Sequence, residues 1–232
     1  MSTGCGPYGP PRSEERKVMS VVAPVIYMPN QNPALPRGRL IFALDATASR
    51  AATWDLAREL QAAMFRAAAP FGRLDVQLAY YRDADECRAS KWLSSGEQLA
   101  QLMNKIDCRA GTTQIGRILR HTLREHDQAP VQALTFIGDA VEESLDPLAG
   151  LASDLGMAGV PIFMFQEGRD LNVCKAFRLL ALRSGGEYFE FDPNKPRAAA
   201  QLSEQLNAVA RLALGDATAL RRIGRANGGR DD

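Results

Sequence analysis

Oxygen-bearing side chains follow the first strongly apolar segment of the chain at every second position. The segment 39–45 (RLIFALD) is a continuous apolar run that ends in an acid, which is typical of a buried strand. Asp45, Thr47 and Ser49 then alternate with alanines. Because alternate residues of an extended segment point the same way, these side chains can present three oxygens to one point. Hard oxygens without His or Cys beside them favour Mg²⁺ or Mn²⁺ over zinc.

A second apolar run also ends in an acid. The segment 131–139 (VQALTFIGD) is strand-like and closes on Asp139. In an open sheet of parallel strands, ligands bind at the carboxyl ends of the strands, beside the point where the strand order reverses. Asp45 and Asp139 are therefore expected at the same edge of such a sheet.

The rest of the chain alternates between strand-like and helix-like segments. Leu56, Leu60, Met64 and Ala67, for example, recur at steps of four and three, which predicts an amphipathic helix. Strands are expected at 39–45, 74–82, 87–93, 131–139, 160–166 and 187–191, and helices at 51–69, 95–106, 113–125, 147–157, 171–183 and 197–214. This alternation predicts an α/β fold, doubly wound and Rossmann-like, with a mostly parallel sheet and helices on both faces.

The two ends of the chain differ in composition from this middle part. Residues 1–38 hold seven of the thirteen prolines, so we expect an extended N-terminal arm in which 21–27 is a candidate edge strand. Residues 215–232 are expected to form an Arg-rich C-terminal tail. One domain is thus predicted at 39–214.

The overall composition argues against several classes of protein. Lys and Arg number 28 against 27 Asp and Glu, so the basic field that nucleic acids require is missing. No apolar stretch approaches the roughly 20 residues that span a bilayer, and the first residues do not have the pattern of a secretory signal. The four cysteines have no Cys-x-x-Cys spacing, which favours free thiols and a cytoplasmic protein.

Common catalytic motifs are missing from the sequence. It contains no glycine-rich nucleotide loop after a strand and no Gly-x-Ser-x-Gly elbow. An aspartyl phosphotransferase of the haloacid dehalogenase type also begins at the end of a first buried strand, but it needs Asp-x-Asp, and position 47 is Thr. An enzyme is therefore not expected, and a metal-dependent phosphoryl-transfer enzyme of α/β type remains the alternative.

Three segments together resemble the von Willebrand factor type A (VWA) domain family. Asp-x-Thr-x-Ser is similar to the family's Asp-x-Ser-x-Ser after the first strand. The segment 110–116 (AGTTQIG) is similar to Gly-Gly-Thr-Asn-Ile-Gly, and 135–140 (TFIGDA) is similar to Ile-Thr-Asp-Gly. The resemblance covers about 39–214 and implies that Thr113 and Asp139 complete the metal-ion-dependent adhesion site (MIDAS) of that family.

The resemblance also implies a function. It predicts Mg²⁺ or Mn²⁺ as the metal, one antiparallel edge strand in the sheet, and a partner protein that presents a Glu or Asp to the metal. A VWA fold that binds no metal is a further alternative. The full set of expected metal ligands is Asp45, Thr47, Ser49, Thr113 and Asp139.

The sequence departs from the family pattern at four positions around this site. Thr47 replaces Ser but keeps the hydroxyl, so metal binding is expected to survive. Thr112 stands where the family often has Gly. Gly138 and Ala140 replace the usual Thr and Gly beside the acid, which bears on the shape of that loop but removes no side-chain ligand.

Other chemically notable residues have simpler interpretations. The acidic turn 80–86 is expected to be solvated, although it could border the metal site. Trp92 is expected to pack on the sheet. His121 and His126 are expected at the surface or as caps, because a spacing of five does not place both on one helix face. Cys87 and Cys108 are expected to be small buried hydrophobes.

Overall fold

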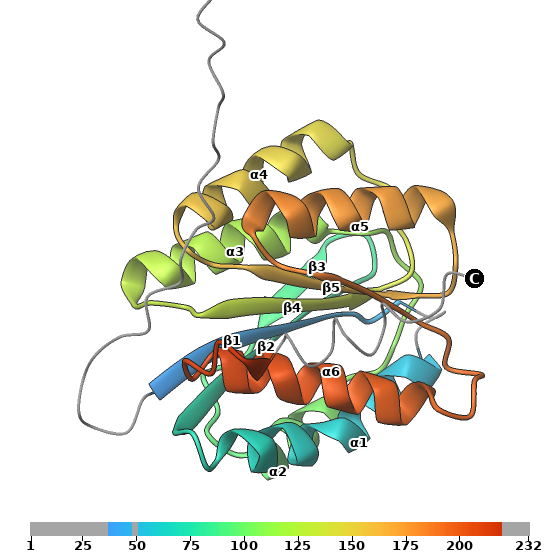
Figure 1. Cartoon of the computed structure of the whole chain (residues 1–232). Helices are drawn as coiled ribbons and strands as arrows, with labels where there is room; N and C mark the ends of the chain where they lie inside the picture. The colour runs from blue at the N-terminus through green and yellow to red at the C-terminus, as the bar shows by residue number, and fades with distance from the viewer. Residues whose placement is uncertain (1–36, 48–50, 220–232) are drawn as a thin grey trace, which may run out of the picture.

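The computed structural model of the chain describes residues 37–47 and 51–219 (Figure 1). Three expectations fall outside these residues: the candidate strand at 21–27, the position of Ser49, and the tail beyond residue 219. The domain boundaries at 39 and 214 remain predictions.

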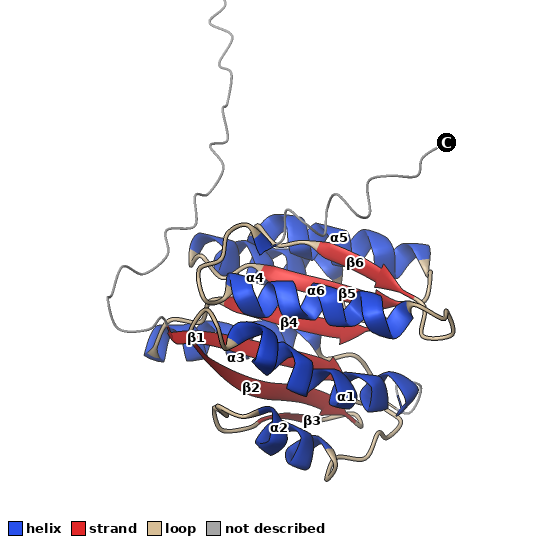
Figure 2. Cartoon of the chain, turned by 60° about the horizontal axis from the view of Figure 1, so that its bottom comes forward, coloured by secondary structure: helices blue, strands red, loops and turns tan. Residues whose placement is uncertain are grey.

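Within the described residues, six strands form one sheet in the order β3-β2-β1-β4-β5-β6 (Figure 2). Edge strand β3 is antiparallel to β2, and all the other neighbours are parallel. The predicted fold class is confirmed, including its single antiparallel edge strand. The strands are β1 (Arg37–Asp45), β2 (Arg73–Arg82), β3 (Glu86–Ala89), β4 (Ala133–Gly138), β5 (Ile162–Glu167) and β6 (Tyr188–Phe191).

Helices cover both faces of the sheet (Figure 1). One face packs against α1 (Ala51–Ala68), α2 (Gly96–Met103) and α6 (Ala198–Leu212). The opposite face packs against α3 (Ile115–Gln128), α4 (Leu145–Met157) and α5 (Leu171–Ser184). Each face therefore has its own hydrophobic core.

The burial of β1 explains why its residues 40–44 are all apolar. Leu40 and Phe42 point into the core beneath α1 and α6, whereas Ile41 and Ala43 point into the core beneath α3, α4 and α5. All four are fully buried. A central strand of a parallel sheet has no solvent-facing side, so the alternation of polar and apolar residues disappears.

The buried face of α1 includes the expected Met64 and also Trp54 and Ala57, which were not expected. Leu56 and Leu60 are only partly buried against the core, whereas Trp54 and Ala57 lie deep within it. The Trp54 indole Nε1 donates a hydrogen bond to the Met103 carbonyl, 3.3 Å away, and this contact with α2 turns the helix toward its tryptophan. The helix was predicted correctly, and of the expected stripe Met64 is the member that is fully buried.

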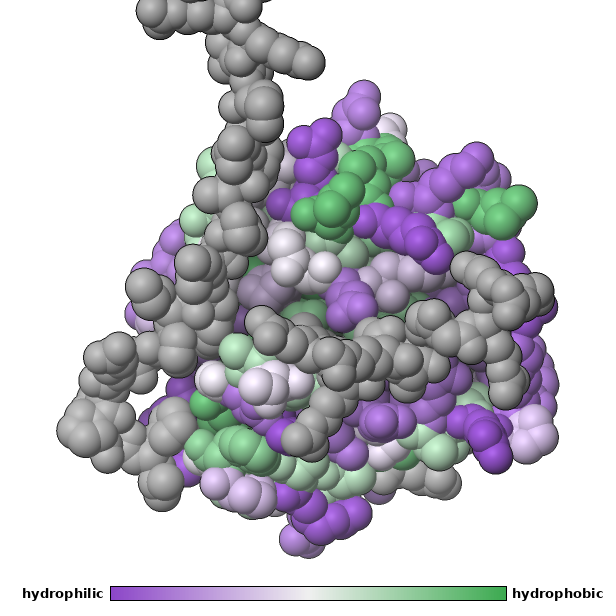
Figure 3. All heavy atoms as spheres, in the orientation of Figure 1, coloured by the Kyte–Doolittle hydropathy of each residue, from purple (hydrophilic) through white to green (hydrophobic). Residues whose placement is uncertain are grey.

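The molecular surface is mixed in character. On the face shown in Figure 3, hydrophilic and hydrophobic side chains are interspersed. Met157, at the end of α4, and Leu171 and Leu182, on α5, are largely exposed. Single exposed apolar side chains are ordinary in soluble proteins. In the part of the chain that is described, no helix combines the length and apolar character needed to cross a bilayer.

Candidate metal site at the carboxyl end of the sheet

Asp45 and Asp139 lie at the point where the strand order reverses. Asp45 ends β1, and Asp139 directly follows β4, which is the neighbour of β1 in the sheet. The chain continues from β1 to β2 on one side and from β4 to β5 on the other. A Cβ placed on Gly138 would be 3.7 Å from Asp45 Cβ, so the two strand ends are in close contact. The expected pair of acids is brought together.

Asp45 is almost completely buried. Its carboxylate accepts hydrogen bonds from the Thr47 backbone N–H at Oδ1 (2.8 Å) and from the Tyr81 hydroxyl at Oδ2 (3.2 Å). Burial raises the pKa of Asp45, and the hydrogen bonds from Thr47 offset only part of this rise. The negative charge of Asp139 raises the pKa further. The site therefore holds an acid whose charge is poorly compensated by the protein itself.

Tyr81 is a member of the site that sequence reasoning missed. It lies beside Asp45 in the register of β1 and β2, is fully buried, and stacks on Phe136 with a centroid separation of 6.2 Å. Burial raises the pKa of Tyr81 well above its ordinary value, with the charge of Asp45 as the next contribution. The phenol consequently remains a hydrogen-bond donor and orients the carboxylate.

Thr113 is held by the loop that follows β4. Its backbone N–H donates to Glu142 Oε2 (2.8 Å), and its hydroxyl accepts from the Glu142 backbone N–H (2.9 Å). The neighbouring Glu143 accepts hydrogen bonds from the backbone N–H groups of Ile115 and Gly116. These contacts join the loop that contains Thr113 to the loop that begins with Asp139. Sequence reasoning singled out neither glutamate, because the contacts depend on two loops that are distant in the chain.

The acidic turn after β2 packs against the same loop. A Cβ on Gly111 would lie 2.5 Å from both the N and O atoms of Asp83, so only glycine fits there. Asp83 itself has a φ of 52°, and its carbonyl accepts a hydrogen bond from Gln114 Nε2 (3.3 Å). Arg82 and Glu86 close the turn with an ion pair at 2.9 Å. The tip of the turn is exposed at Ala84 and Asp85, as expected, and the turn also packs against the loop that contains Thr113.

Comparisons with known proteins give structural neighbours only. No protein-family model and no curated protein matches the sequence. Among solved structures, a von Willebrand factor type A protein from Catenulispora acidiphila has a TM-score of 0.61 at 16% identity. The match covers 78% of this chain and 43% of that one. The chain has the VWA fold.

Two further solved structures have a similar fold, one of a membrane protein and one of a byssus protein. An aerotolerance-related membrane protein from Bacteroides fragilis matches with a TM-score of 0.55 at 16% identity, over 73% of this chain and 98% of that one. Proximal thread matrix protein 1 of the mussel byssus, solved with a zinc-occupied MIDAS motif, matches with a TM-score of 0.58 at 19% identity. That match covers 78% of this chain and 46% of the mussel chain. The mussel and Catenulispora chains are thus more than twice as long as the part that matches.

The donor set on this VWA fold suits a hard cation. Within residues 37–47 and 51–219, no cluster of three or more His, Cys, Asp and Glu side chains is arranged to hold a metal. The expected site needs only two carboxylates, because its remaining ligands are hydroxyls. Thr47 and Thr113 are both buried, at 8% and 7% exposure. A buried carboxylate with a raised pKa is what a nearby cation would stabilise in its charged form.

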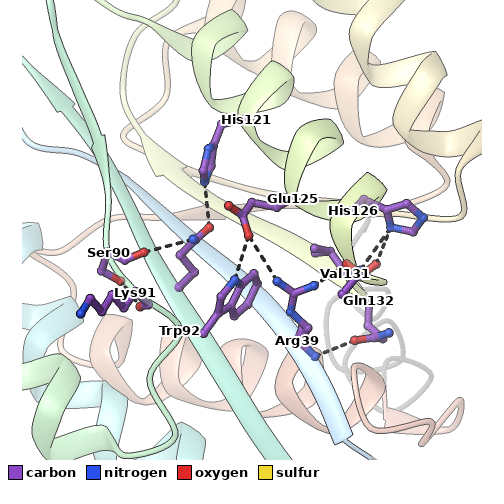
Figure 4. A network of polar contacts seen from close by, with 11 residues as sticks. Arg39, Ser90, Lys91, Trp92, His121, Glu125, His126, Val131 and Gln132 are labelled. Atoms are coloured by element: carbon purple, nitrogen blue, oxygen red, sulfur yellow. Dashed lines mark hydrogen bonds and ion pairs between the residues drawn. The ribbon is translucent and has the colours of Figure 1, made fainter.

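The histidines and Trp92 belong to a separate polar network under α3 (Figure 4). Glu125 accepts hydrogen bonds from Trp92 Nε1 (2.8 Å) and Arg39 Nη2 (3.2 Å), and Arg39 stacks over the indole ring. His126 is half-buried, and its Nδ1 accepts a hydrogen bond from the Val131 backbone N–H (3.2 Å), in the segment between α3 and β4. His121 is half-buried and bonded to a β2 side chain, so its expected surface position was wrong.

The cysteines partly follow expectation. Cys87 and Cys108 are partly buried, each against one of the two cores. Both are thiols, as is Cys174 on α5. Burial raises the pKa of the Cys87 thiol, so it is not an activated nucleophile.

Proposed function

We propose that this chain is a metal-dependent protein-interaction module. In this proposal Mg²⁺ or Mn²⁺ is held at the carboxyl end of the sheet and captures a Glu or Asp side chain of a partner protein. The observation that carries the proposal is the buried Asp45, placed against the β4 strand end with the acid Asp139 and the Thr113 loop beside it. The proposed ligands are Asp45, Thr47, Ser49, Thr113 and Asp139.

The charges of this ligand set explain why an outside acid would be attracted. A dication that is held mainly by neutral hydroxyls keeps part of its positive charge and favours a further anion. Tyr81 and the Thr47 backbone orient the Asp45 carboxylate, and Glu142 fixes the Thr113 loop. The zinc-occupied MIDAS motif of the mussel byssus protein supports a divalent cation at the corresponding edge of this fold.

The proposal includes no catalytic role. Position 47, where an aspartyl phosphotransferase of the haloacid dehalogenase type would carry its general acid, is Thr47. The net charge of +1 gives no basic field for nucleic acid. Three thiols in the described residues are consistent with a reducing, cytoplasmic setting, which is part of the proposal.

Affinity capture from lysate with and without a chelator tests this function. Wild type in Mg²⁺ is expected to retain a partner that is lost with chelator, with Asp45→Ala and with Thr113→Ala. Thr47→Ser is the matched control, because it keeps the hydroxyl oxygen. On the identified partner, changing one Glu or Asp to its amide is expected to abolish binding. A partner retained equally under all these conditions would show that recognition uses another surface.

A further inference from the structure

A pocket outside the candidate metal site lies between α3 and the edge strand β3. Its volume is about 440 Å³, which is within the range of small-molecule sites. Four arginines line it together with one histidine and one cysteine. They are Arg117, Arg120, His121 and Arg124 from α3, and Cys87 and Arg88 from β3.

The arginines of α3 converge on one side of the helix. Positions 117, 120 and 124 are separated by three and four residues, so their side chains share a face. Burial raises the pKa of the Cys87 thiol, the charges of Arg117, Arg124 and Arg120 lower it, and the charge of Glu143 adds a smaller rise. Three guanidinium groups are therefore near enough to influence one atom in the pocket.

Most of this positive charge has no acidic partner. Arg88 is paired with Glu86 at 2.8 Å. Arg117 Nη1 donates to two neutral acceptors, the Asp85 carbonyl and Gln114 Oε1, each at 2.6 Å. Arg120 and Arg124 make no hydrogen bond or ion pair with any residue in the described ranges. Like charges three or four residues apart on a helix destabilise it, and an anion bound between these arginines would offset that cost.

The wall of the pocket behind the arginines is fixed. Gln77 Nε2 donates to the Ser90 carbonyl (3.1 Å), which leaves Gln77 Oε1 to accept from His121 Nε2 (2.8 Å). His121 lies one turn before Glu125, which is tied to Arg39 and Trp92 in the network of Figure 4. A wall held in place before binding lowers the entropic cost of capturing a ligand.

We propose that this pocket binds the phosphoryl group of a small phosphorylated molecule. The planar guanidinium group matches the oxygens of phosphate in pairs, and two of the four arginines have no competing partner in the described residues. The volume is large enough for an organic group attached to the phosphate, so a phosphate ester is expected to bind more tightly than inorganic phosphate. This site does not depend on the proposed metal-dependent function.

Calorimetric titration of the full chain tests the proposal directly. The probes are inorganic phosphate, ribose 5-phosphate and adenosine monophosphate, with citrate and sodium chloride at matched ionic strength. We expect a phosphate ester to bind most tightly and chloride not to bind. The double variant Arg120→Gln/Arg124→Gln is expected to weaken binding at least tenfold, because two charge-assisted hydrogen-bonding groups are lost. Arg183→Gln, at an exposed position on α5, is the control and is expected to leave binding unchanged.

Protection of a thiol gives a second readout that needs no variant. Cys87 lines the pocket, whereas Cys174 lies on α5. A bound phosphate ester is expected to slow the alkylation of Cys87 by iodoacetamide without slowing that of Cys174, as measured by peptide mass spectrometry. The proposal would be overturned if phosphate esters bound no better than chloride or citrate. It would also be overturned if Arg183→Gln lost as much affinity as Arg120→Gln/Arg124→Gln, or if a bound phosphate ester did not slow the alkylation of Cys87.

Discussion

At the scale of single residues, the carboxyl group of Asp45 is in an unfavourable environment. It is 3% exposed, and the hydrogen bonds that it accepts from Thr47 and Tyr81 do not fully compensate for the loss of water. The nearby charge of Asp139 adds to the cost. A hydrophobic or amide side chain of similar shape would avoid this cost, and the proposed metal site gives a reason for an acid at this position.

Asp45→Asn tests this explanation in metal-free protein. Because the folded state raises the pKa of Asp45, its contribution to stability is complete below the ordinary pKa of 3.8 and is lost as pH rises through the folded value. The amide carries no charge and escapes this loss. We therefore expect the free energy of unfolding of Asp45→Asn, relative to wild type, to increase between pH 4 and pH 7. Urea unfolding in chelator at both pH values measures the difference, and an equal difference at the two values would contradict the raised pKa.

The sequence predicted only part of this site. Asp45, Thr113 and Asp139 follow strands or precede a helix, and their positions are readable from hydrophobic patterns and motif spacing. Tyr81 was missed because its contact depends on the register between two parallel strands, which the sequence does not reveal. Glu142 was missed for a similar reason, since its partner is 29 residues away in another loop.

At the scale of elements, α3 begins with a cap that comes from outside the helix. Its N-cap residue, Gln114, makes no side-chain capping bond. Glu143, from the loop after β4, instead accepts from the first backbone N–H groups of the helix. A Cβ on Gly116 would lie 3.0 Å from Glu143 Oε1, so the glycine makes room for the carboxylate. The start of α3 and the loop of Asp139 therefore form one unit.

Removing this cap is expected to destabilise the fold. Glu143→Ala leaves two backbone donors unpaired and should lower the free energy of unfolding by about 1–2 kcal/mol, as for the loss of a strong N-cap. Glu143→Gln keeps an oxygen acceptor and loses mainly the attraction between the carboxylate charge and the dipole of α3. Its free energy of unfolding should fall by about 0.3–1 kcal/mol. Urea unfolding measures both. Glu204→Ala, exposed on α6, is the control and should stay within about 0.5 kcal/mol of wild type. An equal loss in Glu143→Ala and the control would show that the helix start does not rely on this carboxylate.

The element ends show where local sequence patterns stop being informative. A helix was expected at 113–125, but α3 runs from Ile115 to Gln128. The spacing of the apolar residues predicted the presence of the helix correctly. Its first residues differ because Thr113 is engaged by Glu142 and Gln114 by Asp83, both outside the helix. Tertiary contacts of this kind override helix propensity at the ends of an element.

At the scale of the whole molecule, the alternation of strands and helices determined the fold class. The predicted order of elements is observed, and the right-handed connections of such sheets leave few topologies to choose from. A short strand was expected at 87–93, and β3 lies at Glu86–Ala89; its antiparallel edge position was implied by the family resemblance. The topology in turn brings β1 and β4 side by side, which places both acids at one edge of the sheet.

Because both acids belong to neighbouring central strands, metal binding is expected to stabilise the entire fold. A ligand that binds only the folded state at 100 times its Kd adds about 2.7 kcal/mol to the free energy of unfolding. For a domain of this size each kcal/mol raises the Tm by about 2–4 °C, so a shift of roughly 5–10 °C is expected with Mg²⁺ or Mn²⁺. Calorimetry in chelator and in increasing metal measures it. Thr47→Ser should keep the shift, whereas Asp45→Ala should lose it without unfolding, because Asp45 lies at a strand end and contributes little to the core. A melting curve that stays the same from chelator to saturating metal would show that the chain has no such metal site, and it would contradict the proposed mode of partner capture.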